Sequence, residues 1–532
     1  MLKITKYLTY GAMAVLIVMM MTATVVERLH GSPAALNAVY HNPFFIILWA
    51  VAAVSGLIYL SLRGLPKRGA FTMGIHVALA VILCGALVTH IWGVSGMLHL
   101  REGEETSVFE LEDESRADLP FSIRLDSFWI DYHPGSKMPS GYNSKVCFLP
   151  EGRNVHISMN NIAKYRGYRF YQADYDEDGR GSILAVSHDP WGIGITYTGY
   201  ILLLLSMIAF FFQKNTAFRA ALGRVLSAAA VVAAFLLLPS VSASAQPASM
   251  PGGAAGGSGS LAESIYFSIG LPKIPAMICL AFGVALFVLC AVRISRGRRY
   301  PSKVLAAGAV AALVLWLYLT LVIGLRWYLS GTGPYVGRYS VMMLMAWFSS
   351  LAVLLLYRRF PLIEPLGFLL AGFTMLIAGK AGTDLRIMPL MPVLQSPLLS
   401  IHVISMMMSY TLFGLVAFNG VMGVCVSSQK AAGDLRDVSL VVLYPAVFLL
   451  TFGTFLGAVW ANISWGSYWA WDPKETWALV TMLVYSLALH GDSLKPFRNP
   501  RFFHWFTIAA FLCVLVTYFG VNLLLGGMHS YS

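Results

Sequence analysis

The chain has 532 residues, of which 58% are hydrophobic and 12% charged, and its mean hydropathy is +0.69. This composition excludes a soluble globular protein and predicts a polytopic membrane protein, because each membrane-spanning helix needs about 20 predominantly apolar residues. The formal net charge of +12 does not indicate a nucleic-acid partner, because the Lys and Arg residues gather in short loops between apolar segments.

About thirteen apolar segments are predicted to cross the membrane as helices. When they are threaded alternately from a cytoplasmic N-terminus, the loops rich in Lys and Arg fall on the cytoplasmic side, as the positive-inside rule requires. We therefore predict a multi-pass protein of a bacterial cytoplasmic (inner) membrane, with its C-terminus outside. The predicted spans lie near residues 8–27, 43–62, 71–95, 191–212, 225–240, 274–293, 304–325, 339–357, 366–381, 401–427, 438–459, 475–490 and 504–526.

The hydrophilic residues 97–190, between the third and fourth predicted spans, are the one sizeable soluble region. Phe121–His133 alternates apolar and polar residues, as a half-buried strand does. The sequence DEDGRG (Asp176–Gly181) is typical of a turn between two strands. We predict that this region is a small, mostly-β domain on the extracytoplasmic side.

The segment Leu222–Gln246 has two interpretations. Arg224, an apolar run of about 14 residues and the small residues Ala243–Ala245 follow one another as in a secretory signal peptide. The first interpretation is a short fifth span. The second is the remnant of a gene fusion, with cleavage of some of the chain after Ala245. A Gly, Ser and Pro-rich linker, Pro247–Ser260, follows in either case.

The stretch WGSYWAWDPKETWAL, from Trp465 to Leu479, follows the eleventh predicted span on the outer side. Together with Trp460 it holds five of the chain's thirteen tryptophans. One interpretation is an aromatic belt, since Trp is enriched at membrane interfaces, although a belt spreads its aromatics over many span ends. The other is a platform on which a flat conjugated ligand stacks, with Asp472, Lys474 and Glu475 at its polar edges.

Histidines on the same side favour the platform. His402 lies at the outer start of the tenth predicted span, and His529 lies just outside the last one. Two imidazoles beside an aromatic platform suit axial ligation of a haem iron.

A second histidine pair is predicted inside the membrane, towards the cytoplasm. His76 lies eight residues beyond Arg68, about 12 Å inward at 1.5 Å per residue. His490 ends the twelfth predicted span on the same side. Ionisable residues within a span are costly and indicate function. His90 shares the helix of His76 and roughly its face; it is either a spare ligand or a packing histidine.

These residues carry a family resemblance. WGSYWAWDPKETWAL resembles the tryptophan-rich WWD signature of haem-handling proteins in cytochrome c maturation. From about residue 261 to the C-terminal GGMHSYS, the chain is similar to the CcsA (ResC) family of the system II pathway. The first half, with YRGYRFYQADYDEDGRGSILAVSHDP before the fourth span, resembles the partner family CcsB (ResB). The whole chain is similar to the fused CcsBA cytochrome c synthases.

The resemblance implies three regions. Residues 1–213 would be the CcsB-like half with four spans, and residues 214–260 a short span and linker. Residues 261–532 would be the CcsA-like haem-handling domain, with the WWD loop at 460–477.

The resemblance also implies the haem ligands. His402 and His529 would be axial ligands at an outer site, and His76 and His490 at an inner one. Trp465, Trp469, Trp471 and Asp472 would grip the porphyrin. The full set of residues expected to bind haem is His76, His402, His490, His529, Trp460, Trp465, Trp469, Trp471, Asp472 and Trp477.

The activity implied is that of a holocytochrome c synthase, a haem ligase or lyase, which exports haem b and joins it to apocytochrome c. The haem vinyl groups would react with the thiols of a Cys-x-x-Cys-His site, kept reduced by thiol reductants. The chain would supply no catalytic residue beyond those that position haem. Its own six cysteines form no Cys-x-x-Cys pair: Cys84, Cys147, Cys279, Cys290, Cys425 and Cys513.

Two alternatives remain open at this point. A haem-delivery protein of system I shares the WWD loop, but the ResB-like half argues against it. A di-haem b-type membrane electron carrier also needs two histidine pairs at two depths, yet it does not need an exposed aromatic platform.

Overall fold

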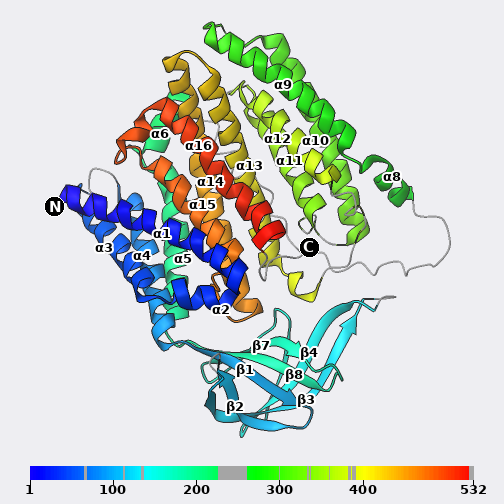
Figure 1. Cartoon of the computed structure of the whole chain (residues 1–532). Helices are drawn as coiled ribbons and strands as arrows, with labels where there is room; N and C mark the ends of the chain where they lie inside the picture. The colour runs from blue at the N-terminus through cyan, green and yellow to red at the C-terminus, as the bar shows by residue number, and fades with distance from the viewer. Residues whose placement is uncertain are drawn as a thin grey trace.

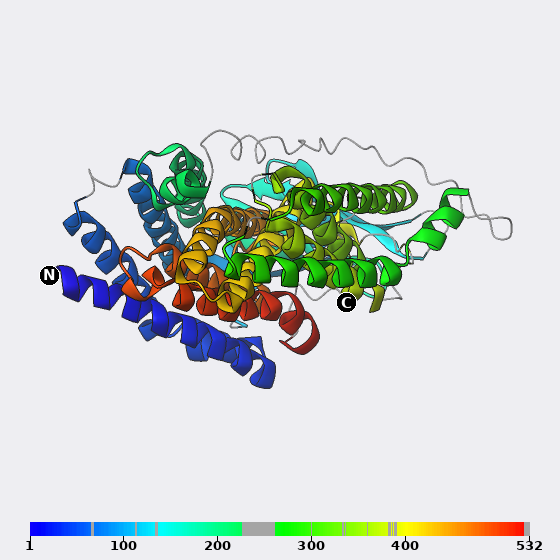
Figure 2. The ribbon, with the colours of Figure 1, turned by 90° about the horizontal axis from the view of Figure 1, so that it is seen from above.

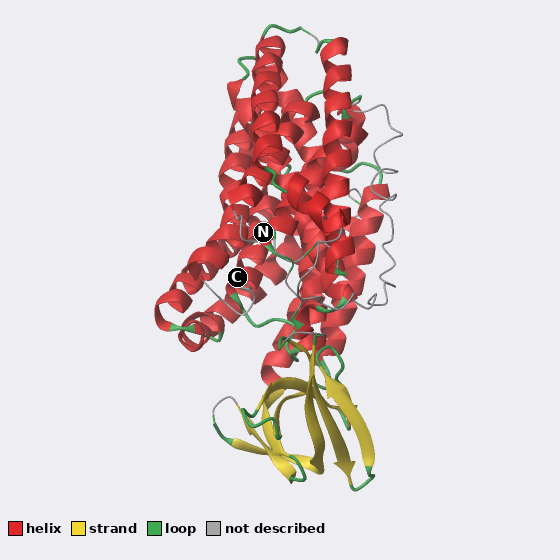
Figure 3. Cartoon of the chain, turned by 90° about the vertical axis from the view of Figure 1, so that its right-hand side faces the viewer, coloured by secondary structure: helices red, strands yellow, loops and turns green. Residues whose placement is uncertain are grey.

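The protein consists of a body of helices with an antiparallel sheet at one end (Figure 1). The structure is a computed structural model. It describes residues 1–64, 69–111, 114–133, 137–225, 261–298, 300–331, 333, 335, 337–358, 360–380, 385, 387 and 391–525. Figure 3 shows the helices in red and the sheet in yellow below them. We call the end of the helices that carries the sheet the sheet end, and the opposite end the far end.

Some of the N-terminal helices precede the sheet in the sequence, and the others follow it. α4 leads into β1, and β8 leads into α5, so these two helices connect the sheet to the body. They pack along each other through Ala78, Ile82 and Leu203. The elements are α1 Leu2–His30, α2 Ser32–Ala35, the π-helical turn η1 Leu36–Tyr40, α3 Pro43–Leu62, α4 Ala70–Trp92, α5 Gly192–Phe212 and α6 Ala217–Val225.

The C-terminal helices form most of the buried core. In α11 and in α13, about two thirds of the residues in the apolar 18-residue stretch are buried inside the protein, whereas in α4 only 11% of them are. Figure 2 shows α14 and α15 between the blue N-terminal helices and the green α9 and α10. The elements are α8 Leu261–Ile269, α9 Lys273–Ser295, α10 Ser302–Ser330, α11 Arg338–Leu356, α12 Ile363–Lys380, η3 Pro392–Leu394, α13 Pro397–Cys425, α14 Gln429–Ser464, α15 Pro473–Leu489, η4 Lys495–Arg498, α16 Pro500–Leu515 and η5 Val516–Leu525.

Eleven helices in the described part of the chain are long and apolar enough to cross a membrane. The sequence predicts about thirteen spans, and the two predicted spans that are not among these eleven helices have separate explanations. The span near residues 475–490 is α15, which has 17 residues. It is not among the eleven because it is one residue shorter than α12, the shortest of them. The span near residues 225–240 lies outside the described residues, apart from Val225 at the end of α6. The predicted class, a polytopic helical membrane protein with a small β domain, is confirmed.

The sheet has eight antiparallel strands in the order β5-β4-β3-β2-β1-β8-β7-β6. The predicted strand 121–133 matches β3 as far as Tyr132, and the predicted turn at 176–181 lies between β7 and β8 and ends on the first residue of β8. The Ser144 hydroxyl of β4 donates a hydrogen bond to Oε1 of Gln172 and lies 2.8 Å from Oγ of Ser182, so these distant strands face each other across a buried polar contact. The strands are β1 Val94–Arg101, β2 Glu105–Leu111, β3 Arg116–Tyr132, β4 Pro139–Leu149, β5 Arg153–Ser158, β6 Ala163–Tyr165, β7 Tyr168–Tyr175 and β8 Gly181–His188.

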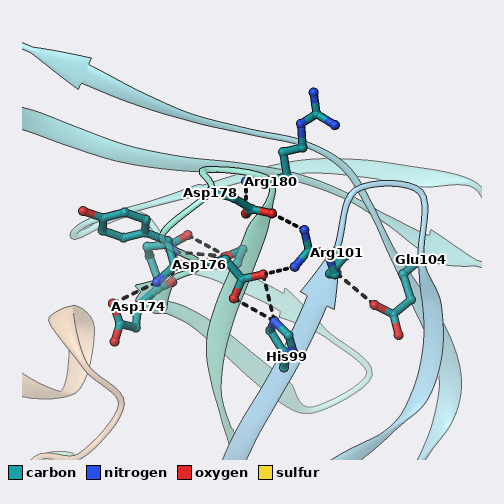
Figure 4. Close-up of polar contacts among 10 residues, drawn as sticks. His99, Arg101, Glu104, Asp174, Asp176, Asp178 and Arg180 are labelled. Carbon is teal, nitrogen blue, oxygen red and sulfur yellow. Dashed lines mark hydrogen bonds and ion pairs between the residues drawn. The ribbon is translucent and has the colours of Figure 1, made fainter.

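A polar network holds the turn between β7 and β8 (Figure 4). Nε2 of His99 lies 2.9 Å from Oδ1 of Asp176, and Arg101 donates to Oδ2 of the same carboxylate at 3.1 Å. Arg101 also pairs with Asp178, which accepts a hydrogen bond from the Arg180 amide at 3.0 Å. The Arg180 amide and the Arg101 guanidinium hold the pKa of Asp178 below its ordinary value. Side chains of β1 therefore balance the charge of this acidic turn.

Candidate functional site

The WWD loop joins α14 to α15 at the sheet end (Figure 1). α14 ends at Ser464, and α15 begins at Pro473 with Asp472 as its N-cap. The Asp472 carboxylate accepts a hydrogen bond from the Lys474 amide at 2.9 Å, and Asp472 is only 4% exposed. Its position therefore suits a helix cap, the role that Asp commonly fills before a Pro at the first helical position.

The five tryptophans of this region fall into two groups. Trp460 and Trp477 are buried in the body, and the Trp477 indole donates to Thr24 of α1 at 3.2 Å. Trp465, Trp469 and Trp471 are partly exposed. The Trp469 and Trp471 rings meet edge to face with 5.7 Å between ring centres. The platform that a flat ligand can reach thus consists of the second group.

Trp471 is held in an unusual conformation by the N-terminal half. Its φ is +58°, in the left-handed region that is costly for a bulky residue. Its ring stacks on Tyr40 with 4.5 Å between ring centres and an 11° interplanar angle. The Tyr40 hydroxyl in turn lies 3.2 Å from Oγ1 of Thr476 in α15. Strained backbone of this kind persists where the surrounding structure fixes it, and it is enriched at functional sites.

The sheet end of α4 holds the other side of the loop. The Tyr468 hydroxyl donates to Oγ1 of Thr89 at 2.8 Å, and Thr89 donates to Asp189 at 2.6 Å. Asp189 also accepts from the Gly192 amide at 2.7 Å, at the start of α5. Burial raises the pKa of Tyr468, so it keeps its proton and remains a donor. The loop is therefore tied to both helices that connect the sheet to the body.

The sheet domain contacts the same region directly. Asn160, between β5 and β6, accepts from Ser464 at 2.6 Å and donates to the carbonyl of Val393 at 3.2 Å. Tyr171 of β7 lies against Gly466. Trp460 and Trp465 pack with Leu394 and Leu399, next to the start of α13. These contacts bring the loop, the sheet and the first turns of α13 together.

His402 lies in the second turn of α13, beside this cluster. Its Nδ1 lies 2.7 Å from the carbonyl of Gly453 in α14, and it is partly exposed. A proton on Nδ1 satisfies that carbonyl and makes Nε2 the unprotonated nitrogen, which is the tautomer that a metal ligand requires. His529, the predicted partner of His402, lies outside the described residues.

His76 and His490 come together at the far end of the N-terminal half. Their ring centres are 6.0 Å apart, although the two residues are separated by 414 positions (490 − 76). Nδ1 of His76 lies 2.7 Å from the Thr72 carbonyl, and Nδ1 of His490 lies 2.6 Å from the Ser486 carbonyl. Both rings therefore direct their Nδ1 protons to the backbone, which leaves Nε2 as the unprotonated nitrogen of each neutral ring.

His90 is not part of the inner pair. Its ring lies 5.5 Å from that of His41, and both residues are exposed. Sequence reasoning missed His41, since no local pattern links a residue after η1 to the end of α4. It also missed Tyr40, Thr89 and Asn160, which hold the WWD loop.

The loop geometry predicts that Gly466 tolerates no side chain. Its φ is +89°, and an added Cβ would lie 2.8 Å from Cε2 of Tyr171. Gly466→Ala should therefore introduce backbone strain of about 1–3 kcal/mol and displace the loop from the sheet. We expect faster amide exchange over residues 465–472 by hydrogen–deuterium exchange. Gly194→Ala, which meets no atom within 4 Å, should leave exchange unchanged. Equal exchange in both variants would contradict this role of Gly466.

Comparison with known proteins places these residues in two matched regions. Residues 335–529 match the family described as "Cytochrome C assembly protein", and residues 67–189 match the "ResB-like family". The first region contains His402, His490 and the WWD loop; the second contains His76 and His90. His41 lies in neither.

Individual relatives agree with the family matches. The chain is 37% identical to Protein NrfI of Wolinella succinogenes over 228 residues, 41% of this chain and 25% of NrfI. It is 36% identical to the cytochrome c biogenesis protein CcsA of Chlamydomonas reinhardtii, over 41% of this chain and 65% of that protein. It is 32% identical to CcsA of Prochlorococcus marinus, over 48% of this chain and 94% of the relative. The chain thus spans less than two thirds of the first two relatives and nearly all of the third.

Proposed function

The chain belongs to the CcsA family of cytochrome c biogenesis proteins, with a ResB-like region in the same chain, and on this premise we propose that it is a haem exporter and holocytochrome c synthase. Haem b is its substrate, taken up at His76 and His490 and presented at the WWD loop. Apocytochrome c with a Cys-x-x-Cys-His site is the acceptor, kept reduced by thiol reductants.

The pairing of His76 with His490 is the observation that carries this proposal. Two imidazoles on opposite sides of one metal, each about 2 Å from it, have ring centres about 6 Å apart. The separation of 6.0 Å between these rings is therefore suited to an iron between them. A metal ligand histidine normally donates its other N–H to a carbonyl or carboxylate, and both of these do so.

The outer site is proposed at the WWD loop. His402 and His529 would ligate the iron, and the partly exposed rings of Trp465, Trp469 and Trp471 would contact the porphyrin faces. The indole N–H group of Trp469 is buried and has no hydrogen-bond partner among the described residues. Unpaired buried donors of this kind are costly, so they favour a site whose ligand brings acceptors, as the haem propionates do.

The contribution of the protein at this site is to position haem and the two thiols for their reaction. In thioether formation, the sulfur of each cysteine bonds to one vinyl carbon and the thiol hydrogen goes to the other, with no leaving group. Holding the vinyl edge of haem against two thiols makes the addition effectively intramolecular, which accounts for much of the expected rate gain. The loop would fix that edge, and it is itself held by Tyr40, Thr89 and Asn160, which come from three different segments of the chain.

The proposal sets an orientation. The sheet end and the WWD loop would face outward from a bacterial inner membrane, because apocytochrome c matures outside the cytoplasm. The far end, with His76 and His490, would then lie towards the cytoplasm. The proposed regions are residues 1–213, 214–260 and 261–532.

Covalent haem on a reporter tests the function. The full chain is expressed with a Cys-x-x-Cys-His reporter in a host that lacks its own maturation system. We expect haem to stay on the reporter after denaturing electrophoresis, and to be absent when both reporter cysteines are Ala. Haem that copurifies with the chain while the reporter stays bare would contradict synthase activity and favour a di-haem electron carrier.

A further inference from the structure

We propose that His41 and His90 form a further haem-iron ligand pair, at the sheet end of α4 and next to the WWD loop. The inference rests on the proposed function, in which haem is the substrate that the chain carries. It assigns a role to two histidines that lie outside the four ligands expected from the sequence.

The first support is the geometry of the two rings. Their centres lie 5.5 Å apart at an interplanar angle of 45°. This separation is close to the 6.0 Å between His76 and His490. Two axial ligands can have any angle between their ring planes, because each plane needs only to contain the bond to the metal. A small outward movement of either exposed ring would therefore admit an iron.

The second support is that neither ring has a packing role. Other histidines of the chain are engaged: His504 is fully buried with Nε2 2.9 Å from the Ala432 carbonyl, and His156 bonds to Asn143. His41 and His90 are exposed, and neither imidazole ring forms a hydrogen bond with another described residue. A packing histidine is satisfied by its surroundings; these two contact each other.

The third support distinguishes haem from a simple metal ion. No group of three or more His, Cys, Asp or Glu residues among the described residues can hold a metal ion. Two imidazoles are thus too few for a zinc site, which takes three or four protein ligands. They are the full axial set for haem iron, because the porphyrin supplies the other four nitrogens.

The fourth support is the position of the pair beside the loop. His41 directly follows Tyr40, which stacks on Trp471. His90 directly follows Thr89, which accepts the hydrogen bond of Tyr468. Each histidine is therefore the chain neighbour of a residue that holds the WWD loop, so a haem on this pair would lie next to the platform.

The helix α4 connects this pair to the inner one. His76 and His90 are 14 residues apart, which is about 21 Å along an α-helix and nearly four complete turns. The two side chains therefore lie on similar faces of α4. One helix thus provides one ligand of the pair at the far end and one ligand of the pair at the sheet end. Their partners are the C-cap residue of α15 and the residue after η1.

Haem binding to the purified full chain tests the pair directly. In a background with His76, His402, His490 and His529 all replaced by Ala, added ferric haem should give a low-spin, bis-histidine spectrum. Adding His41→Ala and His90→Ala should remove that spectrum and weaken binding at least about tenfold, a typical minimum for damage to a haem or metal ligand shell. His30→Ala, an exposed histidine at the same end, is the matched control and should change nothing.

A second variant avoids reliance on a heavily substituted chain. His90→Met in the otherwise native chain should add the signal of a His/Met haem to the bis-histidine signals of the two other sites. An unchanged spectrum and affinity in the His41/His90 variants would overturn the proposal. Because these readouts measure binding and not covalent attachment, failure of the pair and failure of the synthase function are seen separately.

Discussion

Replacing His402 with Ala should abolish covalent attachment of haem to a Cys-x-x-Cys-His reporter, and added imidazole should restore part of it. The His402 ring is fixed by its contact with the Gly453 carbonyl at 2.7 Å, beside the cluster that holds Trp460 and Trp465. Loss of an outer-shell partner of a metal-bound histidine costs about 10–100-fold in metal affinity, so loss of the ligand itself should cost at least as much. Haem stain on the denatured reporter measures the effect.

A second variant tests whether the position of the His402 ring matters when the ring itself is still present. An added Cβ at Gly457 would lie 2.6 Å from Nδ1 of His402, so Gly457→Ala should displace the imidazole without removing it. We expect a smaller loss of maturation than in His402→Ala. Gly324→Ala, also within a helix but with no atom within 4 Å of the added Cβ, is the matched control. Normal maturation by His402→Ala would show that this histidine is not an outer ligand.

The sequence is most informative where a local pattern determines structure. Runs of about 20 apolar residues predict the helices, and the alternation in Phe121–His133 predicts strand β3. The order Asp472, Pro473, Glu475 is also a local N-cap signature, and Ala470 donates to Glu475 at 2.9 Å. Interpreting Asp472 only as a porphyrin contact overlooked this signal, because the aromatic residues around it suggested a ligand.

Contacts between distant segments could not be read from the sequence. Tyr40 stacks on Trp471, 431 positions away (471 − 40), and nothing near Tyr40 indicates the WWD loop as its partner. The same holds for Thr89 with Tyr468 and for His41 with His90. In one case the sequence did place distant residues together: His76 and His490 were expected on one side of the membrane, and the structure brings their rings to 6.0 Å.

His76→Ala and His490→Ala should each strongly lower the haem that copurifies with the chain, and the double variant should lower it no further. The reason is geometric: an iron between two rings at 6.0 Å needs both, so removal of either leaves one axial position empty. Metal affinity should fall at least about tenfold in each single variant. Haem per protein, from the pyridine haemochrome spectrum of the purified full chain, measures the loss.

Non-additivity is the informative part of this experiment. Two residues that act as one unit cost about the same when removed singly or together, whereas independent sites give effects that add. His30→Ala, an exposed histidine at the C-terminal end of α1, should retain the haem of the unaltered chain. Haem content that stays unchanged when both His76 and His490 are replaced would contradict an inner site. The copurified haem would then have to be bound at another site, and His41 and His90 at the sheet end are the other paired histidines of the described chain.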